Sequence, residues 1–465
     1  MGHPDLVVVS NRGPLTFAAG PDGRLTARRG AGGLVSSLGP AVAGTGATWV
    51  AAAITEADRR AAAHGPVEEA GFRLRSLTIE PAAYRRFYDV ISNSTLWFLN
   101  HGLFDLPRRP RIDRRWHEAW DTFRDVNHAF AEAVADEAPS HGTVLVHDYQ
   151  LPLVGARLAA LRPDLHTIHF HHTPFCEPSA LRVLPDRVVA ELLEGMAAHT
   201  ACGFHSERWA VAFEACSRAV LGSSPPTFVS PAALDTEDLA ATAASPACEA
   251  EVARLAALVG DRRVVARVDR MEPSKNHLRG FLAFEALLEA EPRWRERIVF
   301  VACVYPTRET LPEYLAYRTE VEALVRRIND TWATPSWTPV VLDAGDSYVR
   351  SVAALRLYDV LLVNPVRDGL NLVAMEGPVL NERDGVLALS REAGAWDSLG
   401  HAAVSLNPFD VAGTASALSE ALAMGAGERA TRAAALRAVG RRRTPQDWLG
   451  DQLTAATAGA DRATD

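Results

Sequence analysis

Short apolar runs alternate with amphipathic stretches along the whole chain. The apolar runs have the length of buried parallel strands: 6–9, 49–53, 144–146, 167–170 and 227–229 in the first half, and 264–268, 298–304, 340–342, 360–363 and 386–389 in the second. Between them lie helical patterns, such as those over 182–198 and 278–289. Strands that alternate with helices are typical of parallel sheets covered by helices, so the pattern predicts an α/β fold.

The length of 465 residues exceeds what one ordinary core accommodates. An Ala/Ser/Glu-rich region over 230–250 separates the two sets of predicted strands. We therefore predict a first domain over 1–240 and a second domain over 241–440. A weak amphipathic helix and a polar tail are predicted over 441–465.

Composition narrows the classes of protein. Hydrophobic residues make up 48% and charged residues 23%, which is ordinary globular composition, while the net charge of −9 argues against general nucleic-acid binding. Five cysteines without C-x-x-C spacing indicate a reducing compartment and no structural zinc site. The apolar run Leu6–Val9 is too short for a signal peptide or a membrane span, so we expect a cytoplasmic protein without a membrane partner.

Lys275 is the only lysine, and the total of 48 basic residues therefore includes 47 arginines. A general preference for arginine explains the shortage of lysine but not why one position keeps it. Chance survival is one explanation. The other is that this position needs a compact ammonium group, which the planar guanidinium of arginine does not replace.

Two segments near the N-terminus could meet a ligand. Arg12 directly follows the first predicted strand, and ligands of open α/β sheets gather at the carboxyl ends of strands. The glycine-rich segment 29–35 is not a dinucleotide fingerprint, because the third glycine would fall at position 35, which is valine. It is either a structural turn or a flexible loop whose amides approach an anionic or sugar ligand.

Histidines follow two further strands, in His147-Asp148-Tyr149 and in the segment 169–172. Three histidines within four residues suggest a metal cluster, but on a strand His169 and His171 face one way and His172 the other. The spacing matches no familiar zinc motif. We therefore predict no metal site and a single histidine that contacts the substrate.

The segment Arg270-Met-Glu-Pro-Ser-Lys275 joins a strand to a helix. Two cations five residues apart at such a turn form a clamp for a diphosphate, and the start of the helix adds partial positive charge. The alternative is ordinary surface charge. The lone lysine favours the clamp.

The segment Arg367-Asp-Gly-Leu-Asn-Leu-Val-Ala-Met-Glu376 follows another strand. Asp368 can accept hydrogen bonds from sugar hydroxyls, and Gly369 allows a close approach of the backbone. The amides of 370–373, at the start of a helix, can hold phosphate. Glu376 can bind ribose hydroxyls, as an acid does in dinucleotide sites.

Together these segments resemble the trehalose-6-phosphate synthase family of retaining glycosyltransferases. The shared segments, in family order, are Ser10-Asn-Arg, Gly32-Gly33-Leu34, Ser92-Asn-Ser-Thr-Leu-Trp97, His147-Asp-Tyr and Arg367-Asp-Gly-Leu-Asn-Leu-Val. The resemblance covers the chain from Ser10 to about Asp410. It implies the GT-B architecture, in which two Rossmann-like domains face each other across a cleft and a C-terminal helix crosses back to the first domain.

The resemblance also implies roles for individual residues. The implied catalytic residues are Arg270, Lys275, His172 and Asp368. The implied donor-binding residues are Gly33, Arg270, Lys275, Asp368, Gly369, Leu370, Asn371, Leu372, Val373 and Glu376. The implied acceptor-binding residues are Arg12, Tyr88, Trp97, Asp148 and Arg308.

The implied reaction moves glucose from a nucleoside-diphosphate glucose to glucose 6-phosphate and gives trehalose 6-phosphate. The substrates would be its partners, without a cofactor or a metal, and a homo-oligomer is compatible with the sequence. The sequence does not choose between UDP and GDP donors.

Departures from the family pattern keep other activities open. They are Trp49-Val-Ala-Ala, Gln150 where the family has histidine, Met375 where it has lysine, and a shorter segment before Arg308. The alternatives are a glucosylglycerol-phosphate synthase and a pseudoglycosyltransferase that couples a nucleotide-activated cyclitol to an aminocyclitol phosphate. A nucleotide-sugar sensor and a nucleotide-sugar epimerase are the rivals outside this class.

Overall fold

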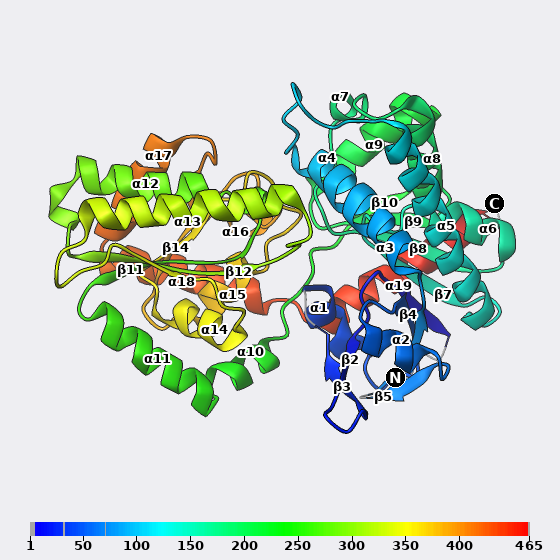
Figure 1. Ribbon diagram of the computed structural model, residues 1–465, viewed down its shortest axis with the longest axis horizontal. Coiled ribbons are helices and arrows are strands. Elements are labelled where there is room, and N and C mark those ends of the chain that lie inside the picture. Colours follow the sequence, from blue (N-terminus) through cyan, green and yellow to red (C-terminus); the bar gives the residue numbers. More distant parts are fainter. Residues whose placement is uncertain (1–4, 31–32, 70, 464–465) are drawn as a thin grey trace. The chain divides into compact units, whose positions relative to one another are not determined.

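The computed structural model describes residues 5–30, 33–69 and 71–463. The chain divides into two compact units (Figure 1). The first unit is Met1–Ala233 with Pro445–Asp465, and the second is Leu234–Thr444. The C-terminal helix therefore belongs with the N-terminal half of the chain.

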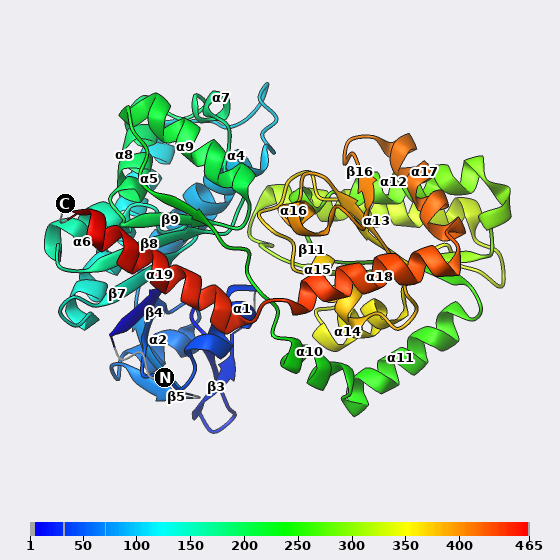
Figure 2. The same cartoon turned by 180° about the vertical axis from the view of Figure 1, so that it is seen from behind.

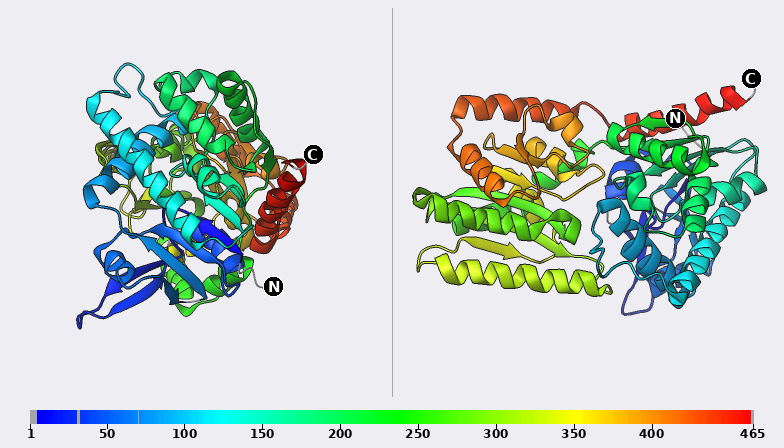
Figure 3. Two further views of the ribbon diagram at one scale, coloured as in Figure 1. Left: turned by 90° about the vertical axis from the view of Figure 1, so that its right-hand side faces the viewer. Right: turned by 90° about the horizontal axis from the view of Figure 1, so that it is seen from above.

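In the described residues, the first unit contains an eight-stranded sheet in the order β10-β9-β8-β7-β1-β4-β6-β5. Its strands are parallel, except that β5 pairs antiparallel with β6. A separate antiparallel hairpin, β2–β3, protrudes from the unit (Figures 1 and 3). The strands are β1 (Leu6–Val9), β2 (Leu15–Ala19), β3 (Leu25–Arg29), β4 (Thr48–Ala52), β5 (Val67–Glu69), β6 (Phe72–Leu77), β7 (Thr143–His147), β8 (His166–His171), β9 (Ala201–Phe204) and β10 (Thr227–Val229).

Helices cover both faces of this sheet. Helix α5 packs over β1 and β4, and the C-terminal helix α19 packs over β7, β8 and β9 on the opposite face (Figures 1 and 2). The helices are α1 (Gly33–Val42), α2 (Glu56–Ala62), α3 (Pro81–Arg85), the π-helix η1 (Arg86–Trp97), α4 (Phe98–His101), α5 (Arg114–Glu137), α6 (Val154–Leu161), α7 (Pro178–Leu181), α8 (Asp186–Ala197), α9 (Glu207–Leu221) and α19 (Pro445–Ala463).

The second unit contains, in the described residues, a six-stranded parallel sheet in the order β13-β12-β11-β14-β15-β16. Helix α13 packs on one face and α14 on the other (Figure 1). The strands are β11 (Arg263–Met271), β12 (Ile298–Pro306), β13 (Val340–Asp343), β14 (Val360–Val363), β15 (Val386–Ser390) and β16 (Val404–Leu406). The helices are α10 (Thr236–Ala243), α11 (Pro246–Val259), η2 (Pro273–Lys275), α12 (His277–Ala290), η3 (Pro292–Trp294), α13 (Pro312–Trp332), α14 (Tyr348–Leu357), α15 (Val373–Leu380), α16 (Trp396–Leu399), α17 (Val411–Ala423) and α18 (Ala426–Arg441).

The predicted strands are all confirmed, with ends that shift by at most one residue, except that β11 and β12 are longer than predicted by four and two residues. The predicted helix over 182–198 is wrong at its start, because α8 begins at Asp186, directly after Pro185. The region 230–250 holds helices α10 and α11. A predicted domain end at 240 falls inside α10, and one at 440 falls inside α18, whereas the units change after 233 and 444.

No helix in the described part of the chain is long and apolar enough to cross a membrane. The five cysteines are buried free thiols. The central strands β1, β7, β11, β14 and β15 are almost fully buried, as expected for parallel strands with helices on both faces.

Candidate functional site

Most of the predicted site residues form two clusters, one in each unit, and each cluster lies at the carboxyl ends of parallel strands. In the second unit Arg270 is near the end of β11, Arg308 follows β12, and the segment 368–376 follows β14. These strands are neighbours in the sheet. We call this group the donor cluster.

The turn that carries Lys275 has a defined local origin. Pro273 begins the single helical turn η2, and Asn276 then takes a left-handed conformation with φ of 63° before α12 starts. The side-chain amide of Asn276 donates to the carbonyl oxygens of Asn364, at 3.0 Å, and Pro408, at 2.7 Å. The turn is therefore tied to the segments that follow β14 and β16.

Lys275 lies between two carboxylates. Its Nζ is 2.5 Å from Asp368 Oδ2 and 4.0 Å from Asp269 Oδ1, and its side chain is 12% exposed. Burial opposes the charged ammonium, but Asp368, Asp269 and Glu272 outweigh it and raise the pKa of Lys275. The lone lysine is therefore a fixed positive charge.

Glu272 is a central residue of the donor cluster that the sequence analysis did not assign. It is fully buried, and its two carboxylate oxygens lie 3.0 Å from Arg270 Nη2 and 2.9 Å from Arg308 Nη1. The hydroxyl of Tyr314 lies 2.7 Å from the same Arg308 nitrogen. An acid two residues after Arg270 was a visible signal, because side chains at i and i+2 of an extended segment share a face.

The loop that follows β14 is held from both sides. Asp368 pairs with the segment 392–394 through backbone hydrogen bonds, and its Oδ2 accepts the side-chain amide of Asn371 at 3.0 Å. Asn371 has a φ of 81°, and its Oδ1 accepts the amide of Ala374 in the first turn of α15. Gly369, Leu370, Leu372 and Val373 lie in this same loop and helix start. The predicted donor loop is thus pre-ordered.

Glu376 lies in the first turn of α15, and burial raises its pKa to about 7. A half-buried carboxyl with this pKa exchanges its proton near neutral pH. The ionised carboxylate accepts hydrogen bonds from hydroxyl groups more strongly than the protonated carboxyl does. A ligand that donates such bonds would therefore favour loss of the proton.

In the first unit Arg12, Asp148 and His172 follow the adjacent strands β1, β7 and β8, and we call this group the acceptor cluster. Arg12 is exposed. The Oδ1 of Asp148 accepts the amides of Tyr149, at 2.9 Å, and His172, at 3.1 Å. These bonds tie the ends of β7 and β8 to each other.

Tyr88 and Trp97 lie in the π-helix η1. Hydroxyl groups of Ser92 and Thr95 bond to carbonyl oxygens five residues earlier, at 2.8 and 2.9 Å. A π-helix takes about one residue more per turn than the 3.6 of an α-helix, so nine residues make about two full turns. Tyr88 and Trp97 therefore share a face, whereas in an α-helix they would point in opposite directions.

The two ends of η1 are linked to residues that adjoin Arg12 and Asp148 of the acceptor cluster. The ring of Tyr88 stacks on Tyr84, with centroids 5.5 Å apart, and the hydroxyl of Tyr84 bonds to the Asn11 side chain next to Arg12. Trp97 lies edge-on to Tyr149, with centroids 5.5 Å apart. The π-helix thus places both predicted aromatic residues beside the ends of β1 and β7.

A chain of three imidazoles fixes the state of His172. The amide of Ala232 donates to His205 Nδ1 at 3.2 Å, so His205 carries its proton on Nε2 and donates it to His172 Nδ1 at 3.0 Å. His172 then donates from Nε2 to His147 Nδ1, also at 3.0 Å. Burial and the neighbouring rings of His205 and His147 lower the pKa of His172 well below its ordinary value. His172 is therefore a neutral imidazole whose two nitrogens are already bonded.

The C-terminal helix α19 reaches this imidazole chain through Trp448, which the sequence analysis also missed. The indole of Trp448 is fully buried, its centroid lies 5.8 Å from that of His172, and its Nε1 donates to the carbonyl of Ser230 at 3.2 Å. The periodicity identified Trp448 as apolar in a helix, but only the packing of α19 shows what it contacts.

The remaining predictions concern Gly33, the histidines of β8 and a metal site. Gly33 begins α1, and residues 31 and 32 of the glycine-rich segment lie outside the described residues. The rings of His169 and His171 lie 5.9 Å apart on the side of the sheet away from the His172 chain, which confirms the predicted alternation. No group of three histidine, cysteine or acidic side chains in the described residues could hold a metal ion. The roles of the individual site residues stay predictions.

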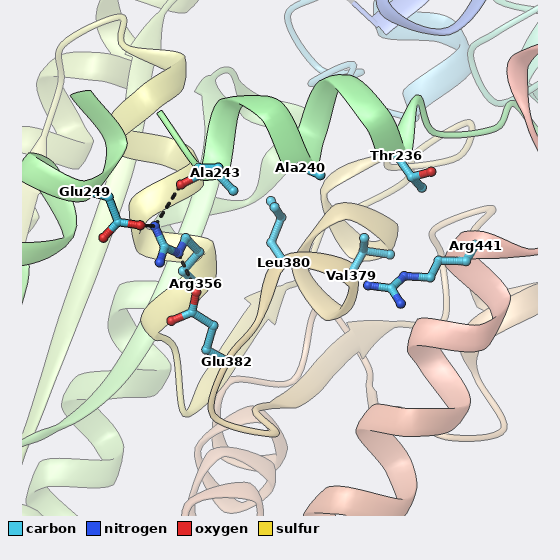
Figure 4. A pocket seen from close by; sticks show the side chains of 10 residues that line it. Thr236, Ala240, Ala243, Glu249, Arg356, Val379, Leu380, Glu382 and Arg441 are labelled. Carbon is cyan, nitrogen blue, oxygen red and sulfur yellow. Dashed lines mark hydrogen bonds and ion pairs between the residues drawn. The ribbon is translucent and has the colours of Figure 1, made fainter. Parts of the chain in front are cut away.

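A cavity of about 460 Å³ in the second unit contains none of these residues (Figure 4). Arg356 extends into it but is neutralised by Glu249, at 2.9 Å, and Glu382, at 2.7 Å. The chemistry of the donor cluster lies elsewhere.

Known proteins resemble this chain over most of its length. Residues 4–458 match the model of glycosyltransferase family 20. The chain is 32% identical to the trehalose-6-phosphate synthase of Mycobacterium marinum, over 90% of this chain and 87% of that protein. It is also 32% identical to a bifunctional trehalose-6-phosphate synthase/phosphatase of Thermoproteus tenax, but there the match covers 96% of this chain and 62% of the relative.

Solved structures show the same fold. A trehalose-6-phosphate structure from E. coli bound with UDP-2-fluoro glucose matches with a TM-score of 0.83 and 28% identity, over 97% of this chain and 98% of that one. An α,α-trehalose-phosphate synthase (UDP-forming) from Burkholderia xenovorans, in complex with glucose-6-phosphate, matches with a TM-score of 0.84 and 26% identity, over 97% and 99%. The predicted α/β fold with two Rossmann-like sheets is confirmed.

Proposed function

The chain belongs to glycosyltransferase family 20, and on that premise we propose that it moves glucose from a nucleoside-diphosphate glucose to glucose 6-phosphate with retention of configuration. The product is trehalose 6-phosphate. The names of the Mycobacterium and Burkholderia relatives support this substrate pair.

The observation that carries the proposal is the donor cluster. One edge of the second sheet gathers two cations for a diphosphate, Arg270 and Lys275, an acid for sugar hydroxyls, Asp368, and an acid for ribose hydroxyls, Glu376. The first turn of α15 adds amides beside the same loop. The diphosphate, the sugar and the ribose of a nucleotide sugar thus each find a group of suitable chemistry.

The reaction needs stabilisation of the leaving diphosphate. The bond between the anomeric carbon and the phosphate oxygen breaks, and the acceptor hydroxyl oxygen forms the new bond on the same face. The acceptor's proton passes to the leaving phosphate oxygen. Positive groups fixed in a water-poor site supply several kcal/mol to such a step. Lys275 is fixed by Asp368 and Arg270 by Glu272, and no divalent ion is required.

The acceptor cluster supplies the second substrate's contacts. Arg12 is exposed at the end of β1 and holds the sugar phosphate. Tyr88, Trp97 and Asp148 line the acceptor side. Both ring nitrogens of His172 are already bonded, Nδ1 to His205 and Nε2 to His147, so His172 neither takes nor supplies the acceptor's proton.

Mass spectrometry of products from UDP-glucose and GDP-glucose, each with glucose 6-phosphate, tests the proposal, and NMR of the anomeric protons reports the configuration. Glycerol phosphate and an aminocyclitol phosphate serve as rival acceptors. We expect trehalose 6-phosphate, unchanged by a chelator. A product from a rival acceptor alone, or conversion of the donor without acceptor, would overturn the proposal.

A further inference from the structure

A fully buried arginine lies in the middle of strand β11. Arg267 has no exposed surface and stands among apolar strand residues. A charged side chain is stable in such a place only when partners compensate for the lost hydration. The positions of those partners show what the arginine holds.

Every hydrogen-bond partner of Arg267 in the described residues belongs to the donor cluster or supports it. Its Nε donates to Asp269 Oδ2 at 3.0 Å, and its Nη2 donates to Asn364 Oδ1 at 2.7 Å and to the backbone carbonyl of Lys275. Asp269 in turn faces the Lys275 ammonium at 4.0 Å. Asn364 accepts, through its own carbonyl, the side chain of Asn276, the residue after Lys275.

A glycine in α12 provides the space for this arginine. A Cβ added at Gly280 would lie 2.6 Å from Arg267 Nη1 and 3.4 Å from Asn364 Oδ1. The end of an arginine normally moves aside at little cost, but here Nε and Nη2 are pinned by three partners. A methyl group at position 280 therefore acts on the Lys275 turn through Arg267, although it touches no substrate.

We propose that Arg267 is a positioning residue, which holds the backbone of Lys275 so that the ammonium group is aimed at the donor diphosphate, and that Gly280 is the space this function requires. The inference rests on the proposed function. It adds two residues that the family resemblance did not assign, and it makes a small residue in a helix a determinant of turnover.

The perturbation of choice is Gly280→Ala, because Arg267→Met could simply fail to fold. A misplacement of about 1 Å can cost 10²-fold in rate, so we expect Gly280→Ala to lower kcat/KM by about 10- to 10²-fold. Gly427→Ala is the matched control: it makes the same change in helix α18 of the same unit, where an added Cβ meets no atom within 4 Å. It should leave kcat/KM unchanged.

A double-mutant cycle separates positioning from general structural damage. If Arg267 acts through Lys275, Gly280→Ala should lower kcat/KM less than about threefold in a Lys275→Ala background, because that background lacks the ammonium group that Arg267 positions. An equal loss in both backgrounds would overturn the proposal, and so would a Gly280→Ala enzyme within twofold of wild type. If the wild-type chain transfers glucose to no acceptor, the proposed function fails instead, and the same cycle is then read from the Kd of UDP and GDP by calorimetry.

Discussion

Replacement of Lys275 tests whether the reaction needs a lysine at this position or whether the residue is an accident of composition. In Lys275→Ala, the positive charge 2.5 Å from Asp368 and 4.0 Å from Asp269 disappears. Loss of one fixed electrostatic stabiliser typically costs about 10²–10³-fold in kcat. Lys275→Arg keeps the charge, but the longer planar fork spreads it over three nitrogens and suits bidentate contact with the two carboxylates. We expect the Lys275→Arg variant to have a kcat at least about tenfold below that of the wild type.

Loss of Lys275 should also lower the stability of the second unit. A cation on the open wall of a site would leave folding unaffected, but Lys275 is 12% exposed and pairs with Asp368, which is 15% exposed. Loss of a charge-assisted hydrogen bond costs about 2 kcal/mol, or roughly 4–8 °C in Tm for a unit of this size. Lys275→Arg should recover most of that stability but little of the rate.

Steady-state kinetics with saturating donor, run beside thermal melts, separates the two effects. If Lys275→Arg turns over at nearly the wild-type rate, the lone lysine is an accident of composition. If the rate losses of both variants simply follow their losses of Tm, the role of Lys275 is structural.

Three further predictions concern Glu376, His172 and Trp448. The pKa of Glu376 is raised to about 7, and ribose hydroxyls bond to its ionised form. The affinity for a nucleoside diphosphate, measured by calorimetry, should therefore rise about fivefold from pH 6 to 7. In the Glu376→Gln variant the affinity should not change over this pH range. In ¹⁵N NMR at pH 7, the ring of His172 should be neutral and carry its proton on Nε2. The His205→Leu variant removes the donor to Nδ1, so His172 should no longer be confined to that tautomer. A charged ring or an Nδ1 proton in the wild type would contradict the chain of imidazoles. Trp448→Ala should destabilise the first unit by about 3–5 kcal/mol in denaturant melts, whereas an unchanged melt would show that α19 docks without its indole.

The sequence by itself predicted ten of the sixteen strands that the described residues form, and the sheet edge at which the candidate site residues lie. Alternation of apolar runs with helical patterns sufficed for two parallel sheets, because strands buried on both faces must be apolar throughout. The position of Arg270, Lys275 and Asp368 directly after such strands placed them at one sheet edge, since parallel strands end on the same side. These are local signals, and each is visible within about ten residues of sequence.

Only the tertiary structure decided how these side chains are held. Glu272 binds Arg270 and Arg308, which lie 38 positions apart, and no local pattern pairs them. The face shared by Tyr88 and Trp97 depends on a π-helix, whose extra residue per turn is not encoded in hydrophobic periodicity. Contacts between distant segments depend on packing, and packing is a property of the whole fold rather than of a motif.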